Sequence, residues 1–551
     1  MNRKAIALSI PFFVLALIGA NNALDTTGTI SVTGNVVDGS GNPVRGATVT
    51  AFNDDLAASI SVVSAVDGSF RFDALPGADY RYRSRLMGLE DSHIAAGSTT
   101  PLAFVMPPAK DLDAQRPANN LLDLLKFEDE ADALNFRMMC TYCHQVGTLG
   151  WRSPEEPVDW EVMITRMDGF RGLYKHTQDS LVDRLVSVYG RDAEKSWPAF
   201  VPPEPPSGDS LKVEISEWAM SKEDAATVHD LEVGIDGLIY AVDMSNDALL
   251  TLDPKTGERK TYSWPGGKTF GEPVAPIKGP HSIEMAANGD MWVTLALSGE
   301  MSKFDIRTKE FTTVSAHPTR ARGGYPHTLR LDKQGVVWWT DAARSVFSLQ
   351  PDTLVVKEYV LPSADQVRGE GARGESRGIT PYGIDIAPDG MVWYTKLNGQ
   401  RVGRIDPTAA DGSPDQIVEW KPPVHGPRRL HVAPNGIVWV PGWASGDFAS
   451  FDPKTEEWKV YDMPKGPNSL PYALNVHPTT GDIWICGTGT DSMLRFDPKT
   501  ETFTEYLMPT RVTYTREIEF DEDGNVWTCN SNGPTRHIEN HYGSLIKIAL
   551  K

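Results

Sequence analysis

Three stretches of this chain decide its fold: PHSIEMAANGDMWVT at residues 280–294, PHTLRLDKQGVVWWT at 326–340 and PYGIDIAPDGMVWYT at 381–395. Their shared Trp stands at positions 292, 338 and 393 and recurs at 439, 484 and 527, and Tyr240 occupies the equivalent place of an earlier unit. A repeat of roughly 40 to 50 residues built from four short strands is typical of a β-propeller. Seven such units predict a seven-bladed propeller over residues 211–551.

The two ends of the repeat region predict how the ring closes. The last unit finishes as YGSLIKIALK without a further strand, and an extra strand-like segment, KVEISEW at 212–218, precedes the first unit. We expect this segment to complete the seventh blade, because closure of the ring removes the exposed sheet edges of an open array.

One position at the start of each innermost strand is polar in all seven units. In chain order it holds His229, His281, His327, Tyr382, Arg428, Tyr472 and Arg516. The residue two places later is always apolar, so we take period-2 alternation to separate a packing layer from a polar ring around the central channel. We predict these seven side chains to be catalytic or substrate-binding. The alternative is that they only organise water and cap strands.

The residue types in this ring suggest two kinds of chemistry. The three histidines His229, His281 and His327 could hold a divalent or transition metal, or act as acid and base. The two arginines could hold a carboxylate or oxyanion, which favours a small, anionic substrate.

A second candidate site lies in a short helical region at residues 120–199. It contains Cys140, Cys143 and His144 in the motif C-x-x-C-H, in which two thiols bind the vinyl groups of haem and the histidine becomes an iron ligand. We therefore predict one covalently bound haem c. Met167 is the candidate for the second axial ligand, with Met163 and His176 as competitors and helix packing as the alternative role of both methionines.

The segment from residue 28 to 107 alternates apolar and polar residues between tight turns, such as Asp38-Gly39 and Asp67-Gly68, and predicts a small β-sandwich. Its pattern G-x-V-x-D-x-x-G-x-P-V-x-G-A-x-V, carried by Gly34 to Val49, resembles the carboxypeptidase regulatory-like domain. The resemblance implies a spacer or adhesion module without catalytic residues. The fold class is thus mainly β: a seven-bladed propeller, an N-terminal sandwich and a small α-helical cytochrome c module between them.

The propeller pattern resembles the virginiamycin B lyase family. Members are seven-bladed propellers that open a cyclic depsipeptide ester by elimination, using magnesium and channel-facing His and Glu. The resemblance places the paired histidines on His281 and His327, whereas the position expected to hold Glu is Tyr325 in this sequence.

Residues 1–23 have the layout of a cleaved signal peptide, with Arg3 and Lys4 before an apolar run and small residues at its end. We expect a periplasmic or otherwise exported protein without stable membrane insertion. The count of 53 Lys and Arg against 73 Asp and Glu gives a net charge of -20, which disfavours nucleic acid as a partner and suits a basic redox protein. Cys486 and Cys529, which share a register position in neighbouring units, could form a disulfide or remain two buried thiols.

Together these features predict an exported monohaem cytochrome c fused to a substrate-binding propeller, acting as an oxidoreductase or electron-transfer protein on a small organic substrate. Two alternatives stay open. One is a C–O lyase of the streptogramin type with haem in an accessory role, and the other is a non-catalytic electron carrier that docks a partner.

Overall fold

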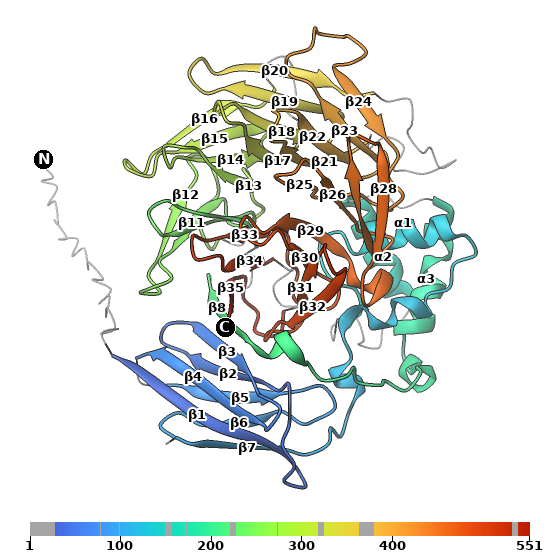
Figure 1. Ribbon diagram of the computed structural model, residues 1–551. Helices are drawn as coiled ribbons and strands as arrows, with labels where there is room; N and C mark the ends of the chain where they lie inside the picture. Colours follow the sequence, from blue (N-terminus) through green and yellow to red (C-terminus); the bar gives the residue numbers. More distant parts are fainter. Residues whose placement is uncertain are drawn as a thin grey trace, which may run out of the picture.

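The computed structural model describes residues 28–551 except 78, 99, 149–156, 171–174, 221–226, 273, 318–323, 363–378 and 532–537. The chain is mainly β, with a β-sandwich, a helical region and a propeller (Figure 1). The predicted signal peptide lies outside the described residues. In the described part of the chain, no helix is long and apolar enough to cross a membrane.

The N-terminal sandwich packs two sheets face to face. One has the strand order β4-β1-β7 and the other contributes β3-β2-β5-β6. The strands are β1 Thr29–Asp38, β2 Thr48–Asn53, β3 Ala58–Val63, β4 Ser69–Pro76, β5 Arg81–Arg85, β6 Ser92–Ile94 and β7 Leu102–Met106. Alternate residues, among them Val36, Phe72 and Phe104, form the core between the sheets. Gly68 has a φ of +76°, and a Cβ there would lie 2.4 Å from the carbonyl oxygen of Val36, so this turn requires glycine.

The helical region follows the sandwich and lies beside the last blades of the propeller (Figure 1). Its elements are η1 Asp113–Gln115, η2 Ala118–Leu124, α1 Glu130–Cys140, α2 Pro157–Phe170, α3 Lys175–Tyr189, η3 Ala193–Ser196 and η4 Gly208–Leu211. Helix α1 begins after Asp129, whose carboxylate accepts a hydrogen bond from the Ala131 N–H, and it ends at the first cysteine of the C-x-x-C-H motif. Phe136, Trp160 and Leu185 belong to one hydrophobic cluster with residues of the propeller, so the helices are anchored to the ring by apolar packing.

Each of the first six blades is a four-stranded antiparallel sheet. Their strands are β9 Val228–Val233, β10 Ile239–Asp243, β11 Ala248–Leu252 and β12 Arg259–Ser263; β13 Pro280–Met285, β14 Met291–Leu295, β15 Glu300–Phe304 and β16 Phe311–Ser315; β17 Pro326–Leu331, β18 Val337–Asp341, β19 Ser345–Gln350 and β20 Val355–Val360; β21 Pro381–Ile386, β22 Val392–Lys396, β23 Arg401–Ile405 and β24 Ile417–Trp420; β25 His431–Val432, β26 Val438–Gly442, β27 Asp447–Asp452 and β28 Glu457–Asp462; β29 Pro471–Val476, β30 Ile483–Gly487, β31 Ser492–Asp497 and β32 Thr502–Leu507. A short turn, η6 Gly466–Ser469, joins blades five and six. The recurring Trp lies on the second strand of its blade and is buried, as at Trp292 and Trp527.

The seventh blade confirms the predicted closure. It has the order β33-β34-β35-β8, in which β33 Glu519–Phe520, β34 Val526–Asn530 and β35 Ser544–Leu550 come from the C-terminus and β8 Val213–Ala219 comes from the segment before the first blade. The other edge of β8 pairs with β3 of the sandwich, so the two domains share one eight-stranded sheet. The outer edge of this blade is therefore covered by the sandwich.

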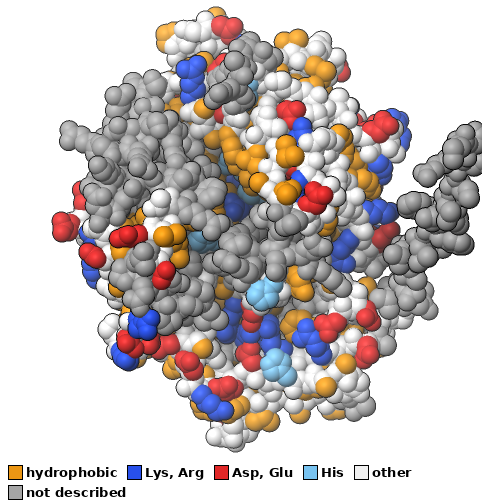
Figure 2. All heavy atoms as spheres, turned by 180° about the vertical axis from the view of Figure 1, so that it is seen from behind, with side chains coloured by type: hydrophobic (Ala, Val, Ile, Leu, Met, Phe, Trp, Pro, Cys, Tyr) orange, Lys and Arg blue, Asp and Glu red, His pale blue; other side chains and the backbone are white. Residues whose placement is uncertain are grey.

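The surface of the molecule carries charges of both signs. Figure 2 shows basic and acidic side chains interspersed over the face opposite to that of Figure 1. Where the sandwich meets the seventh blade, Arg85 forms ion pairs with Asp91 and Glu539, both at 2.6 Å. The pair with Glu539 fixes the sandwich against the propeller and lies apart from the channel.

Candidate functional site at the channel mouth

The structure brings the seven predicted ring residues together at one end of the channel. They are His229, His281, His327, Tyr382, Arg428, Tyr472 and Arg516, and each is at most 5% exposed. The ring centroids of His229 and His281 are 3.8 Å apart, those of His281 and His327 are 4.2 Å apart, and His327 is 4.0 Å from Tyr382. These four side chains thus form a continuous run of contacts.

A β-bulge, rather than simple alternation, turns these side chains away from the apolar layer. In the second blade the pairing register shifts between Pro280 and Ile283, and the same shift occurs in the third, fourth and sixth blades. In an unbroken strand, the ring residue and the apolar residue two positions later would face the same side of the sheet. Our prediction that period-2 alternation separates the polar ring from the apolar layer was therefore wrong, and the bulge separates them.

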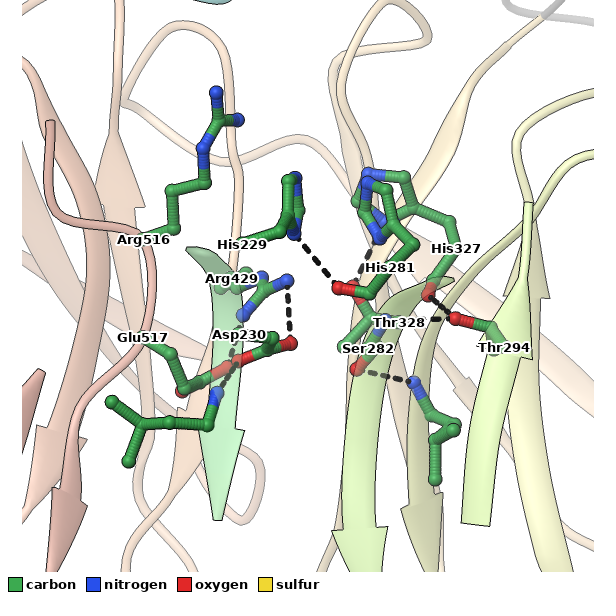
Figure 3. A network of polar contacts seen from close by, with 12 residues as sticks. His229, Asp230, His281, Ser282, Thr294, His327, Thr328, Arg429, Arg516 and Glu517 are labelled. Atoms are coloured by element: carbon green, nitrogen blue, oxygen red, sulfur yellow. Dashed lines mark hydrogen bonds and ion pairs between the residues drawn. The ribbon is translucent and has the colours of Figure 1, made fainter. Parts of the chain in front are cut away.

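A threonine recurs two residues after the Trp in blades two, three and four, and its hydroxyl group binds the backbone that carries the ring side chains. The Thr294 hydroxyl accepts a hydrogen bond from the Ser282 N–H at 2.9 Å and donates one to the carbonyl oxygen of His327 in the next blade at 2.8 Å (Figure 3). Thr340 and Thr395 donate in the same way to the carbonyl oxygens of Tyr382 and Arg428. The repeated Thr therefore links each bulge to its neighbour and fixes the position of the ring side chains.

The histidine half of the ring is not arranged as a metal site. His229 donates from Nδ1 to the carbonyl oxygen of His281 at 2.7 Å, and the three imidazoles lie against one another with planes tilted by 41° and 50° (Figure 3). Ligands of one metal would instead point their nitrogen atoms at a common centre about 2.0–2.1 Å away. Within the described ranges, no group of three or more His, Cys, Asp or Glu is placed to hold a metal ion. The predicted second metal on His229, His281 and His327 does not fit this geometry.

Burial also controls the charge of the His229 imidazole. It lowers the pKa of His229 well below its usual value, and the neighbouring His281 and Arg516 lower it further. His229 is therefore neutral around pH 7 and acts as a hydrogen-bond donor within the ring.

The other half of the ring contacts the C-x-x-C-H segment, which lies over the channel mouth. The Tyr514 hydroxyl lies 2.5 Å and 2.6 Å from the carbonyl oxygens of Thr141 and Tyr142, which accept its hydrogen bond. Arg516 donates from Nη2 to the carbonyl oxygen of Cys143 at 3.2 Å. The two sites predicted separately from the sequence are thus one site.

Gln145 fixes the same segment on its far side. Its Nε2 lies 2.9 Å from the carbonyl oxygen of Thr488, 2.8 Å from Oδ1 of Asp491 and 2.6 Å from the carbonyl oxygen of Thr513. The Val146 N–H donates to the side-chain oxygen of Asn119 at 2.9 Å. The segment that follows the motif is therefore held by blade six, by the loop that leads from it to blade seven, and by the helical region.

Tyr142 lies between the two motif cysteines, directly before Cys143, and its ring inserts into the channel mouth. It lies edge-on to Tyr382, with ring centroids 6.1 Å apart, and the Arg428 guanidinium carbon is 4.5 Å from its centroid. Tyr382 and Tyr472 contact each other through their hydroxyl groups at 2.5 Å. Burial alone would raise the pKa of Tyr472, but the guanidinium groups of Arg516 and Arg428 lower it below its usual value.

The donor set of the motif fits a haem group. Cys140 ends α1, and burial raises the pKa of its thiol to about 12, while the Cys143 side chain is exposed. The His144 Nδ1 lies 2.9 Å from the carbonyl oxygen of Gln145. Because a carbonyl oxygen can only accept, Nδ1 carries the proton, and Nε2 keeps the lone pair that an iron ion needs. Burial lowers the pKa of His144, which keeps the imidazole neutral.

Placement of the sixth ligand remains a prediction. Met167 is half-buried on α2, whereas Met163 packs against the hydrophobic cluster that joins the helices to the propeller. The side chain of His176 lies outside the described residues.

Deeper in the channel lies a charged layer that the sequence reasoning missed. Arg429 pairs with Asp230 at 3.0 Å and with Glu517, and Arg330 pairs with Glu517 at 3.5 Å and Glu284 at 3.3 Å. Figure 3 shows Arg429, Asp230 and Glu517 clustered next to the histidines, with Arg516 extended away from them. Further members of this layer are Glu232, Asp385, His431 and Glu519. The signal was present in six of the seven units, which carry a carboxylate or guanidinium group one or three residues after the ring position.

Cys486 and Cys529 are both free and buried. Burial raises the pKa of Cys486 to about 12 and raises that of Cys529 as well, so both thiols are protonated. Of the two possibilities left open by the sequence, the structure has the free thiols.

Comparisons with known proteins agree with the two β-domains. Residues 271–530 match the Virginiamycin B lyase family, and residues 31–107 match the carboxypeptidase regulatory-like domain. Virginiamycin B lyase from Nocardia farcinica is 26% identical over 147 residues, an alignment that spans 26% of this chain and 44% of that protein. The chain thus carries a virginiamycin B lyase-like propeller together with a carboxypeptidase regulatory-like domain.

Solved structures support the propeller fold. A structure of streptogramin B lyase superposes with a TM-score of 0.51 and 19% identity, covering 63% of this chain and all of that one. A catalytically inactive virginiamycin B lyase from Staphylococcus aureus with quinupristin superposes with a TM-score of 0.50 and 16% identity, covering 62% of this chain and all of that one. At these identities the likeness establishes the fold alone.

Proposed function

We propose that the protein is an exported redox protein in which Cys140, Cys143 and His144 carry one covalently bound haem c and the propeller positions this haem over its channel mouth. It would act as an oxidoreductase or electron-transfer protein on a small organic substrate. When bound, the haem would supply one-electron transfer. The observation that carries the proposal is the set of hydrogen bonds from Tyr514 and Arg516 to the carbonyl oxygens of the motif.

The contacts suggest a division of labour within the ring. Tyr514, Arg516 and Gln145 hold the motif backbone, so the thiols and His144 keep a fixed position relative to the propeller. A spacer between domains would not need three buried polar side chains to hold one loop. Fixing a redox group against a second site keeps the distance for electron transfer constant.

The test is maturation of the full chain in a host that attaches haem c. We expect one haem per chain, a reduced α-band typical of a c-type cytochrome, and haem that stays with the polypeptide under denaturing conditions. Cys143→Ser should leave the haem extractable, and Cys486→Ser, a buried thiol outside the motif, is the matched control. A chain that acquires no covalent haem under these conditions would refute the proposal.

A second candidate is a lyase of the streptogramin type, favoured by the family match over residues 271–530. In this chain Tyr142 fills part of the mouth beside Tyr382, and Tyr325 stands where the resemblance expects Glu. Magnesium-dependent opening of a streptogramin B ring by the Cys143→Ser form would support the lyase, since that form lacks the covalent haem.

A further inference from the structure

Arg428 is a buried charge without a hydrogen-bond partner. Its side chain is 0% exposed, and none of its three guanidinium nitrogens has a hydrogen bond in the described structure. Four aromatic rings surround it: the guanidinium carbon lies 4.0 Å from the centroid of Trp443, 4.2 Å from Tyr472, 4.5 Å from Tyr142 and 5.1 Å from Tyr382. Aromatic faces attract a cation, but they do not replace the N–H···O hydrogen bonds that a guanidinium makes in water.

Arg516 places a second positive charge beside the first. Its guanidinium donates to the Ser531 hydroxyl at 2.6 Å, the Tyr472 hydroxyl at 3.2 Å and the carbonyl oxygen of Cys143, all of them uncharged groups. Among the described side chains, no carboxylate forms an ion pair with Arg428 or Arg516, whose titratable surroundings are tyrosines and Cys143. Within the residues that the structure describes, the mouth therefore holds two guanidinium charges without a carboxylate counter-ion.

Three carboxylates of the channel are already paired with other arginines. Asp230 and Glu517 pair with Arg429, and Glu517 and Glu284 pair with Arg330. They cannot also neutralise the mouth without breaking these buried pairs, which is costly. A ligand with a carboxylate would supply a negative charge that none of the described side chains places beside Arg428 or Arg516.

We propose that Arg428 and Arg516 form a carboxylate-binding site between the propeller mouth and the C-x-x-C-H segment. A planar carboxylate matches the fork of a guanidinium and accepts two N–H bonds from it. The aromatic rings around Arg428 exclude water and favour a small, flat ligand. The Tyr382 and Tyr472 hydroxyls supply further hydrogen-bonding groups at the same place.

Two sources could supply this carboxylate: a propionate of the attached haem, or the carboxylate of a free substrate. The choice between them rests on the proposed function, whereas binding of a carboxylate by the propeller mouth does not. Tyr142 covers Arg428, so a free ligand reaches the guanidinium when this side chain turns away, and Tyr142→Ala should tighten binding of a small carboxylate.

The test uses the full chain in two forms, with attached haem and as the Cys140→Ser, Cys143→Ser double variant. Acetate is titrated into each by calorimetry at constant ionic strength, and acetamide, its neutral analogue, is the control ligand. We expect the haem-free form to bind one acetate and to bind acetamide at least tenfold more weakly. Arg428→Gln should weaken acetate binding about 10- to 100-fold, because a hydrogen bond to a charged group is lost. Arg307→Gln, a change at an exposed arginine, should not alter it.

The two sources predict different results. If haem attachment abolishes acetate binding, the carboxylate is a haem propionate; if both forms bind acetate, it belongs to a free substrate. A chain that attaches no haem but binds acetate through Arg428 would refute the proposed function and support this site. Equal binding of acetate and acetamide, or no acetate binding to either folded form, would overturn the proposal. Should Arg428→Gln fail to fold, Arg516→Gln provides the same comparison.

Discussion

Replacement of Tyr142 by alanine should loosen the C-x-x-C-H segment from the propeller. Tyr142 is only 6% exposed and packs against Tyr382 and the Arg428 guanidinium. Truncation of a large buried aromatic side chain to alanine costs about 3–5 kcal/mol, a figure that here includes a desolvated cation–π contact of about 2 kcal/mol. The hydrogen bonds from Tyr514 and Gln145 remain, so the segment should open more often without detaching.

Hydrogen exchange of the Val146 amide measures this opening. In the wild type this N–H donates to the side-chain oxygen of Asn119 in a buried position, so it exchanges only when the segment opens. At about 1.4 kcal/mol per tenfold change, the expected cost corresponds to faster exchange by roughly two to three and a half powers of ten.

The matched control is Tyr142→Phe, which keeps the ring over Arg428 and should change the exchange rate only a few-fold. An alanine variant whose Val146 amide is as protected as in the wild type would refute the reasoning. A phenylalanine variant as labile as alanine would show that the hydroxyl, and not ring packing, holds the segment.

Three further predictions concern the rest of the molecule. Burial raises the pKa of Asp230 and Glu232 to about 7 each, so the folded state keeps protons that the unfolded chain releases near pH 4. The free energy of unfolding, measured by urea titration, should therefore fall as the pH rises from about 4 to about 7. Glu232→Gln should reduce this dependence on pH. Cys486 and Cys529 should react with a thiol reagent only after denaturation, and reaction of the folded protein would contradict their burial. A chain that begins at residue 120 should aggregate by light scattering, because loss of β3 leaves one edge of β8 unpaired; a monodisperse truncated protein would show that the sandwich is not needed as a cover.

The propeller was accessible to sequence reasoning because its signals are local. Every blade has a polar residue at the start of its first strand, six of the seven have the buried Trp, and five have a D/N-G turn, with a period of about 45 residues. The pairing of β8 with β35 could be predicted as well, since a ring with one strand missing at the end and one extra at the start has one simple closure. The pairing of β8 with β3 could not, because nothing in either strand specifies which edge a neighbouring domain will cover.

The contact between the channel ring and the C-x-x-C-H segment could not be predicted from the sequence for a related reason. The contact between Arg516 and Cys143 joins residues 373 positions apart, and no pattern within either segment encodes it. The bulge at the start of the inner strand in blades two, three, four and six was equally hidden, although Thr294 and its counterparts, which contact it, were visible as part of the repeat. Residue types were thus predictable where the repeat fixes them, and their partners were not.

The distribution of charge explains how an acidic protein can present a positive site. The chain carries a net charge of -20, but exposed charges are screened within about 8–10 Å at physiological ionic strength. At the channel mouth the balance is set by groups within a few ångströms. No described carboxylate pairs with Arg428 or Arg516, and Asp230, Glu517 and Glu284 of the next layer pair with Arg429 and Arg330. A buried charge interacts far more strongly than a distant exposed one. The preference of this site for an anion therefore follows from the separation of the two layers and not from the overall charge.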